Sequence, residues 1–298
     1  MGKAGDILTQ GSCVASRRTF VGGVVGSAVA GWSGLALGQL EPVTFGLTPV
    51  FLDSDIKLLT ALKGYLEKRL MRRVTLVKKR TYQEITLMLL SGQLDAAWIC
   101  GFPFVRYRDQ LSLMAVPVYN GKPLYQSYVI VNEAQEARRF SDIRGSTHAF
   151  SDPDSNSGFL VTRSLLAGMN ERPETFFSKS FFTYGHRNVI RAVASGLAQS
   201  GSVDGYVWDV MNSTEPDMTA RTRVIRKSEL LGFPPVACIK SARNSETTRL
   251  ITEALISMPE DNLGREVLAT LHLDGFQPGS ASLFNGIASL YEIVKRQT

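Results

Sequence analysis

The stretch VTLVKKRTYQEITLMLLSGQLDAAWICG, residues 74–101, decides the fold class. Val74–Lys78 has the β-branched composition of a strand, and the apolar spacing over Tyr82–Leu90 indicates an amphipathic helix. After a Ser-Gly stop the chain becomes apolar again over Leu94–Ile99, which indicates a second strand. A strand–helix–strand unit of this length predicts parallel strands with a crossover helix.

The same alternation extends in both directions from this unit. Upstream, Val43–Thr48 predicts a strand, and Asp53 and Ser54 begin a helix that runs to about Leu70. Downstream, we expect strands at Tyr125–Val131, Thr147–Phe150, Phe181–Tyr184, Val203–Val207 and Pro234–Ile239, a polar helix before Ser141, and helices from near Asn156 and at Val189–Leu197, Ser245–Met258, Leu263–Leu271 and Ser282–Lys295. The chain is therefore predicted to be an α/β protein.

The first residues have the features of an export signal. Residues 16–39 begin with the adjacent arginines Arg17 and Arg18, with Phe20 two positions further, and continue as a glycine-rich, weakly apolar run. This pattern resembles a twin-arginine signal, so we expect cleavage after Gly38 and export of the remaining chain. A membrane-spanning helix is the alternative, which the many glycines in so short an apolar run disfavour.

Charge and composition exclude a nucleic-acid partner. The formal net charge of +6 is modest and scattered, and the basic residues at 69–73 and 78–80 fit a solvated surface. A nucleic-acid-binding domain would need a concentrated basic stripe and a recognition motif, neither of which is present.

The three cysteines are not equivalent. Cys13 lies within the predicted signal, which leaves Cys100 at the end of a strand and Cys238 in the apolar segment PPVACIK. In an exported protein these two would pair by default, but Cys238 also fits a free, buried, small apolar residue. The sequence leaves both alternatives open.

The segment SDPDSNSGFL, residues 151–160, is the richest in polar groups. Ser155, Asn156, Ser157 and Gly158 lie where a strand ends and a helix begins, so backbone N–H groups and hydroxyls would form a cradle for an oxyacid. An ordinary helix cap is the alternative, because serine, aspartate and asparagine are the commonest cap residues.

Other polar residues fall at strand ends in the same way. They are Thr48, Cys100, Tyr184, His186, Asp204 and Trp208. Because ligands of open α/β sheets collect at the carboxyl ends of strands, these residues and the cradle predict a binding cleft.

Catalysis has little support. The chain has no G-x-S-x-G elbow, H-E-x-x-H, phosphate loop or G-x-G-x-x-G, and its three histidines lack metal-ligand spacing. A thiol hydrolase or transferase using Cys100 and His186 is the remaining alternative. We therefore expect a non-enzymatic protein without a cofactor.

Four segments together resemble the periplasmic solute-binding proteins for phosphate, phosphonate and phosphite. They are FGLTPVFLDSD, LDAAWICGFPFV, the cradle DPDSNSGFL with its S-D-I-R-G connector, and GHRNVIRAV followed by GSVDGYVWD. The resemblance implies a type II periplasmic-binding-protein fold, in which two lobes with mixed sheets flanked by helices are joined by two hinge strands. The lobes would comprise residues 39–125 plus 236–298 and residues 126–235. It also implies a periplasmic, monomeric protein.

The chain departs from this family's usual pattern at two positions. A small residue usually follows the third strand and an acidic residue usually follows the histidine, whereas this chain has Cys100 and Arg187. A thiol is a poor partner for a phosphate-like dianion and a good one for a thiophilic centre such as trivalent arsenic.

In this respect the chain resembles a subgroup of arsenite-binding periplasmic proteins that report to a membrane histidine kinase. That resemblance implies an As–S bond to Cys100, arsenic hydroxyls held by Ser155, Asn156 and Ser157, and a cleft lined by the other strand-end residues. The alternative is the substrate-binding component of an importer for phosphite, phosphonate or phosphate, with a permease as partner.

Overall fold

The computed structural model describes residues 41–49 and 56–297. The strands of the first sheet, in spatial order, are β13 (Gly275–Gln277), β4 (Leu111–Val118), β12 (Val236–Ile239), β3 (Ala96–Trp98), β1 (Val43–Leu47) and β2 (Val74–Lys78). Those of the second are β10 (Thr222–Lys227), β6 (Ser127–Asn132), β9 (Ser200–Asp204), β7 (Thr147–Phe150) and β8 (Lys179–Phe182). The predicted signal and the predicted helix start at Asp53 and Ser54 lie outside the described residues.

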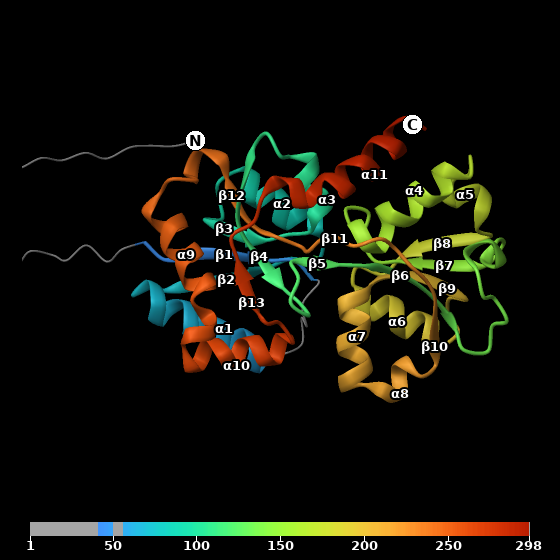
Figure 1. The fold of residues 1–298 in the computed structure, drawn as a ribbon, viewed down its shortest axis with the longest axis horizontal. Helices are drawn as coiled ribbons and strands as arrows, with labels where there is room; N and C mark the ends of the chain where they lie inside the picture. The colour runs from blue at the N-terminus through green and yellow to red at the C-terminus, as the bar shows by residue number, and fades with distance from the viewer. Residues whose placement is uncertain (1–40, 50–55, 298) are drawn as a thin grey trace, which may run out of the picture. The chain divides into compact units, whose positions relative to one another are not determined.

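Helices cover both sheets (Figure 1). With the first sheet lie α1 (Ile56–Leu70), α2 (Tyr82–Leu90), α3 (Gly101–Arg106), α9 (Glu246–Ile256) and α10 (Asn262–Leu271). With the second lie α4 (Val161–Gly168), α5 (Pro173–Phe176), α6 (His186–Ala194), α7 (Gly205–Thr214) and α8 (Pro216–Thr219). The last helix, α11 (Asn285–Lys295), packs against both α3 and α4.

The strand directions confirm the parallel unit read from residues 74–101. β1 pairs in parallel with β2 and with β3, and β7 pairs in parallel with β8 and β9. The remaining ladders of the two sheets are antiparallel, because β12 and β13 in the first sheet and β6 in the second run the other way. Both sheets are therefore mixed, as the resemblance implies.

Two crossings connect the sheets. The chain leaves the first sheet through β5 (Leu124–Tyr125) and returns through β11 (Leu231–Gly232), and these two short strands pair antiparallel. The lobe boundaries at 125/126 and 235/236 stay a prediction. The described residues all belong to one compact unit.

Several strands and one loop differ from the sequence-based expectations. The expected strand Val203–Val207 is wrong beyond Asp204, because α7 begins at Gly205. β4, β10 and β13 had no prediction; Pro117 in β4 argues against a strand, but this residue pairs with Phe276 of a short neighbouring strand. The expected polar helix before Ser141 is wrong, and only a short 3₁₀ turn forms at Phe140–Ile143. The Arg223 side chain instead binds carbonyl groups of this loop that a helix would use internally.

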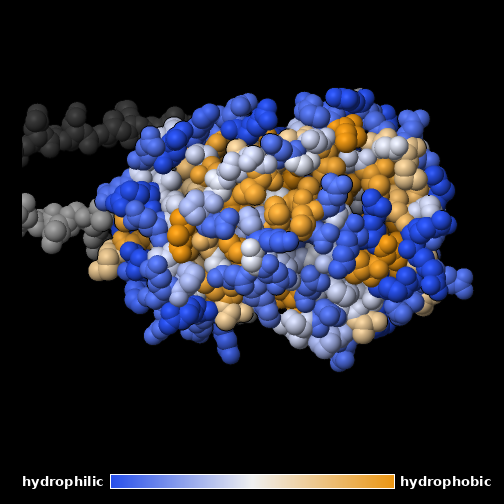
Figure 2. All heavy atoms as spheres, viewed as in Figure 1, coloured by the Kyte–Doolittle hydropathy of each residue, from blue (hydrophilic) through white to orange (hydrophobic). Residues whose placement is uncertain are grey.

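The surface carries a mixture of residue types. Figure 2 shows hydrophobic residues in patches separated by hydrophilic ones on one face of the molecule. Within residues 41–49 and 56–297, no helix is both long and apolar enough to cross a membrane.

Candidate ligand-binding site

Cys100 lies at the carboxyl end of β3 and is the N-cap residue of α3. Its side chain is buried, and its Sγ accepts a hydrogen bond of 3.2 Å from the backbone N–H of Asn156 in the other lobe. Burial raises the pKa of the thiol to about 12, two N–H groups lower it, and the carboxyls of Asp204 and Asp152 raise it. The thiol is therefore protonated at neutral pH and has acidic neighbours.

The predicted cradle is a π-helical turn, Asn156–Leu160, that opens α4. Its cap is Ser155, whose Oγ accepts the N–H of Gly158 at 3.0 Å. A Cβ at position 158 would lie 1.8 Å from the Ser151 Oγ and 2.9 Å from the His186 ring, so only glycine fits there. π-turns are rare and occur often at functional sites.

Four buried polar atoms around this turn have no hydrogen-bond partner among the described residues. They are Tyr82 Oη, Ser151 Oγ, Asn156 Oδ1 and Ser157 Oγ. Most buried polar atoms in proteins are paired, because an unpaired one costs roughly 1–3 kcal/mol. Atoms of this kind gathered in one place therefore indicate a ligand site.

Electrostatic coupling places these groups close together. The pKa of the Tyr82 phenol is raised by burial and by the neighbouring Cys100, Asp152, Asp204 and Tyr125. The Tyr125 phenol in turn accepts a hydrogen bond of 2.8 Å from Asn156 Nδ2. We call this set the oxyacid cluster: Tyr82, Cys100, Ser151, Asn156, Ser157 and Asp204.

Asp204 caps α7 and joins the cluster from the end of β9. Its Oδ1 accepts the N–H of Tyr206 at 2.9 Å, and the Ser157 hydroxyl lies beside the carboxyl and lowers its pKa. Burial is the larger effect and raises that pKa to about 7. Asp204 therefore keeps its proton to a much higher pH than an exposed aspartate does.

His186 is neutral and fixed in one tautomer. Burial lowers its pKa to about 3, and its Nδ1 accepts the backbone N–H of Asp204 at 3.0 Å. The ring proton therefore lies on Nε2, which can donate a hydrogen bond.

The two lobes are in contact around the cluster. Asp152 Oδ2 accepts the backbone N–H of Tyr82 at 3.2 Å, and Arg106 forms an ion pair of 3.3 Å with Asp154. Both contacts join α2 or α3 of the first lobe to the loop before the cradle. A ligand in the cluster would thus be enclosed by both lobes.

Three predicted site residues have other contacts. Thr48 lies at the same sheet edge as Cys100, but its hydroxyl donates to the Trp98 carbonyl at 3.1 Å. Tyr184 has a left-handed backbone with φ of 54°, and the Arg80 guanidinium stacks on its ring. Trp208 donates its indole N–H to Thr222 Oγ1 at 3.0 Å, toward β10 and away from the cradle.

The sequence did not identify Tyr82, Ser151 or Tyr125 as site residues. Tyr82 is the first residue of α2 behind a Thr81–Glu84 capping box, and Ser151 directly follows β7. Both positions are junctions between strand and helix, the same signal that identified the cradle. Tyr125 is in a crossing strand, where no sequence signal marks a site.

The two remaining cysteines are separate. Cys100 and Cys238 are both buried and free. β12 runs antiparallel to β3, with Val236 opposite Trp98, so Cys238 lies toward the far end of this ladder. A disulfide between them is therefore absent.

A closed, two-lobed α/β structure with a buried polar cluster between its sheets defines a periplasmic-binding-protein fold. The family of periplasmic substrate-binding proteins of phosphonate ABC transporters matches residues 45–284, so the chain belongs to this family. Its members bind substrates and deliver them, and they are not enzymes.

Solved structures have the same fold. A binding protein component of an ABC phosphonate transporter from Pseudomonas aeruginosa superposes with a TM-score of 0.79 at 20% identity, covering 86% of this chain and 87% of that chain. PhnD1 from Prochlorococcus marinus, in complex with methylphosphonate, superposes with a TM-score of 0.77 at 16% identity. The match covers 85% of this chain and 98% of that chain. The alkanesulfonate-binding protein SsuA from Xanthomonas axonopodis pv. citri, bound to MOPS, superposes with a TM-score of 0.60 at 16% identity. The match covers 86% of this chain and 93% of that chain. These likenesses establish the fold.

Proposed function

We propose that this protein captures arsenite, As(OH)₃, in the oxyacid cluster and reports its presence to a membrane partner. The observation that carries the proposal is the buried Asn156 Oδ1, which has no hydrogen-bond partner and lies in the same turn as the unpaired Ser157 hydroxyl. An amide oxygen can only accept hydrogen bonds, so it requires a ligand that donates them. Arsenite is neutral near pH 7 and carries three hydroxyl donors, whereas a phosphonate dianion has none on its oxygens.

The charges around the site support the same ligand. The acidic groups that act on the Cys100 thiol, Asp204 and Asp152, would repel a dianion. Two arginines on neighbouring elements are held in ion pairs: Arg106 pairs with Asp154, and the Arg187 terminal nitrogen pairs with Glu215. A neutral ligand avoids this repulsion.

The thiol would bind arsenic by exchange. The Cys100 S–H bond and one As–OH bond break, an S–As bond forms, and the thiol proton leaves with the hydroxyl as water. No electron is transferred. The two hydroxyls left on arsenic would meet the atoms that lack partners, namely Asn156 Oδ1 and the hydroxyls of Tyr82, Ser151 and Ser157.

Calorimetric titration with arsenite tests the thiol. Cys100→Ser should weaken binding roughly 100-fold, equivalent to about 2.7 kcal/mol, since the S–As bond cannot form. Cys238→Ser is the matched control, because that thiol is also buried but lies away from the cluster. Equal affinity of wild type and Cys100→Ser would refute this mechanism.

Family membership supports a second candidate, the import of phosphite, phosphonate or phosphate. In that case Cys100 only packs beside the ligand, and Asp204, whose pKa burial raises, would accommodate a monoanion when it is protonated. Methylphosphonate or phosphite would then raise the melting temperature, more strongly at pH 6 than at pH 8, and arsenite would have no effect.

The partner and the export route belong to the same proposal. Ligand contacts from both lobes favour the closed form, and a sensor histidine kinase would read that form. A neighbouring kinase gene with an arsenite oxidase supports this partner, whereas a permease and an ATPase support import. Export through the twin-arginine route predicts that replacing Arg17 and Arg18 by lysine leaves the protein in the cytoplasm.

A further inference from the structure

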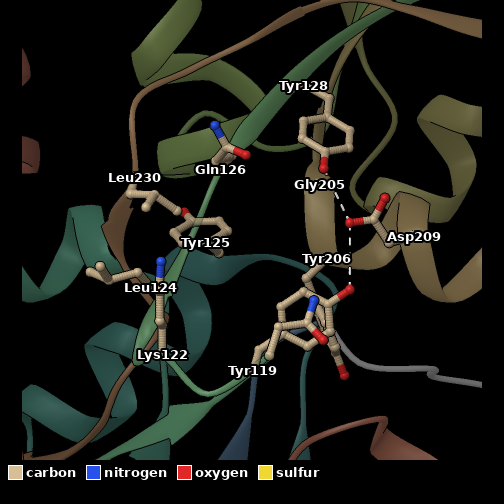
Figure 3. A pocket seen from close by; sticks show the side chains of 11 residues that line it. Tyr119, Lys122, Leu124, Tyr125, Gln126, Tyr128, Gly205, Tyr206, Asp209 and Leu230 are labelled. Atoms are coloured by element: carbon tan, nitrogen blue, oxygen red, sulfur yellow. Dashed lines mark hydrogen bonds between the residues drawn. The ribbon is translucent and has the colours of Figure 1, made fainter.

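A cavity lies at the hinge, beside the oxyacid cluster. Its volume is about 220 Å³, and its walls come from the β4–β5 connection, β5, β6 and α7 (Figure 3). Tyr125 separates it from the cluster: the phenol oxygen accepts from Asn156, and the same residue lines the cavity. Neither Cys100 nor the cradle contributes to its lining. We call it the hinge cavity.

Tyrosines dominate the walls of the hinge cavity. Tyr119, Tyr125, Tyr128 and Tyr206 all line it. Tyr119 and Tyr206 pack edge to face with ring centroids 5.1 Å apart, and the Tyr206 hydroxyl donates to the Leu271 carbonyl of the other lobe. Rings that are held in this way need no reordering when a ligand binds.

Asp209 supplies a carboxylate at one wall. The phenols of Tyr128 and Tyr119 donate to its Oδ2 at 3.1 and 3.4 Å, as the dashed lines in Figure 3 show. Both bonds go to one oxygen, so Oδ1 can accept from a ligand. A carboxylate between tyrosine rings is the arrangement that favours organic cations, through charge and cation–π attraction.

The chain itself already places a cation on one of these rings. The Lys227 ammonium lies 4.5 Å from the centroid of Tyr128, and Lys227 does not line the cavity. Lys122 does line it, but this side chain is exposed and points toward Tyr125, across the cavity from Asp209 (Figure 3).

We propose that the hinge cavity binds a small organic cation, a primary ammonium or a guanidinium group, between the tyrosine rings and the Asp209 carboxylate. This site is separate from the oxyacid cluster and does not depend on the ligand proposed there. Because its walls come from both lobes and the hinge, an occupied cavity would favour the closed form.

Nuclear magnetic resonance titration of the full chain with ethylammonium chloride, at constant ionic strength, tests the site. We expect saturable shifts of tyrosine ring signals in the wild type. Asp209→Asn keeps the size and an acceptor oxygen but removes the charge, and should weaken binding about tenfold. Lys122→Gln should tighten binding, because it removes a nearby positive charge.

Two controls separate this site from the oxyacid cluster. Cys100→Ser should bind ethylammonium as the wild type does, and Asp209→Asn should bind arsenite as the wild type does. The proposal is overturned if the wild type shows no saturable binding, if Asp209→Asn binds ethylammonium equally well, or if arsenite displaces the cation.

Discussion

Two buried polar clusters each lie beside a histidine of the second lobe, and they differ in how completely their polar atoms are hydrogen-bonded. Around His148 every side-chain polar group is paired: Nδ1 and Nε2 each meet a serine hydroxyl at 2.8 Å, and these serines bond to Ser146 and Thr162. Around His186 the oxyacid cluster leaves four atoms unpaired. Both histidines are almost fully buried, so burial does not distinguish them.

The completeness of hydrogen bonding therefore separates a structural cluster from a binding site. The His148 network ties β7, β9 and α4 together, and its satisfied groups stabilise the sheet. The oxyacid cluster leaves acceptors and donors available to a ligand, and these unpaired groups destabilise the ligand-free protein.

The largest expected effect is on stability and comes from the paired cluster. His148→Leu keeps the packing against Phe177 but leaves the hydroxyls of Ser200 and Ser202 without the ring. We expect the free energy of unfolding to fall by about 3 kcal/mol in urea titrations. Arsenite affinity should change little, since the network does not reach the cluster. Wild-type stability of this variant would contradict the comparison.

The pH dependence of stability should have opposite signs in the two clusters. The folded-state pKa of Asp204 is raised from 3.8 to about 7, so the folded protein holds this proton more tightly, and the contribution to stability falls as pH rises from about 4 to about 7. The folded-state pKa of His148 is lowered from 6.5 to about 3, so the folded protein binds this proton less tightly. The contribution of His148 to stability therefore rises as pH rises from about 3 to about 6.5.

Urea titrations of wild type and Asp204→Asn between pH 4 and pH 8 isolate the first contribution. The variant should gain roughly 4 kcal/mol relative to the wild type across this range, because asparagine has no proton to lose. If the difference in the free energy of unfolding between the two proteins does not change with pH, then the pKa of Asp204 is not raised in the folded protein.

The smallest expected effect is that of Ser157→Ala. Its hydroxyl is buried and unpaired, so removing it should leave the free energy of unfolding unchanged or raise it by less than about 1 kcal/mol. Arsenite affinity should fall about fivefold, because one hydrogen bond to the ligand is lost. A clear loss of stability without a loss of affinity would place Ser157 with the structural cluster.

Local patterns predicted most of the individual elements. The strand Val74–Lys78 and the helix Tyr82–Leu90 form at the residues expected, because apolar spacing and the Thr81–Glu84 capping box are local properties. β4, β10 and β13 had no such pattern, and the pairing of β13 with β4 joins segments more than 150 residues apart in sequence.

The candidate site was predictable only where it coincides with strand ends. Cys100, Asn156 and Asp204 were identified because each follows a strand, and parallel strands bring such positions to one edge. Trp208 and Thr48 satisfied the same rule, yet their polar groups bond to Thr222 and Trp98. Position along the chain does not determine where a side chain points.

The sequence by itself determined the class of this protein: the alternating elements, the cradle and the family follow from residues that are near one another in the chain. Only the tertiary structure decided which of the polar residues remain unpaired. Cys100 and Tyr82 of the first lobe contact Asn156 and Asp152 of the second because the two lobes close on one another, and no local pattern records those contacts. Hydrogen-bond pairing is a property of the packed molecule, since the partner of each group is supplied by a distant segment.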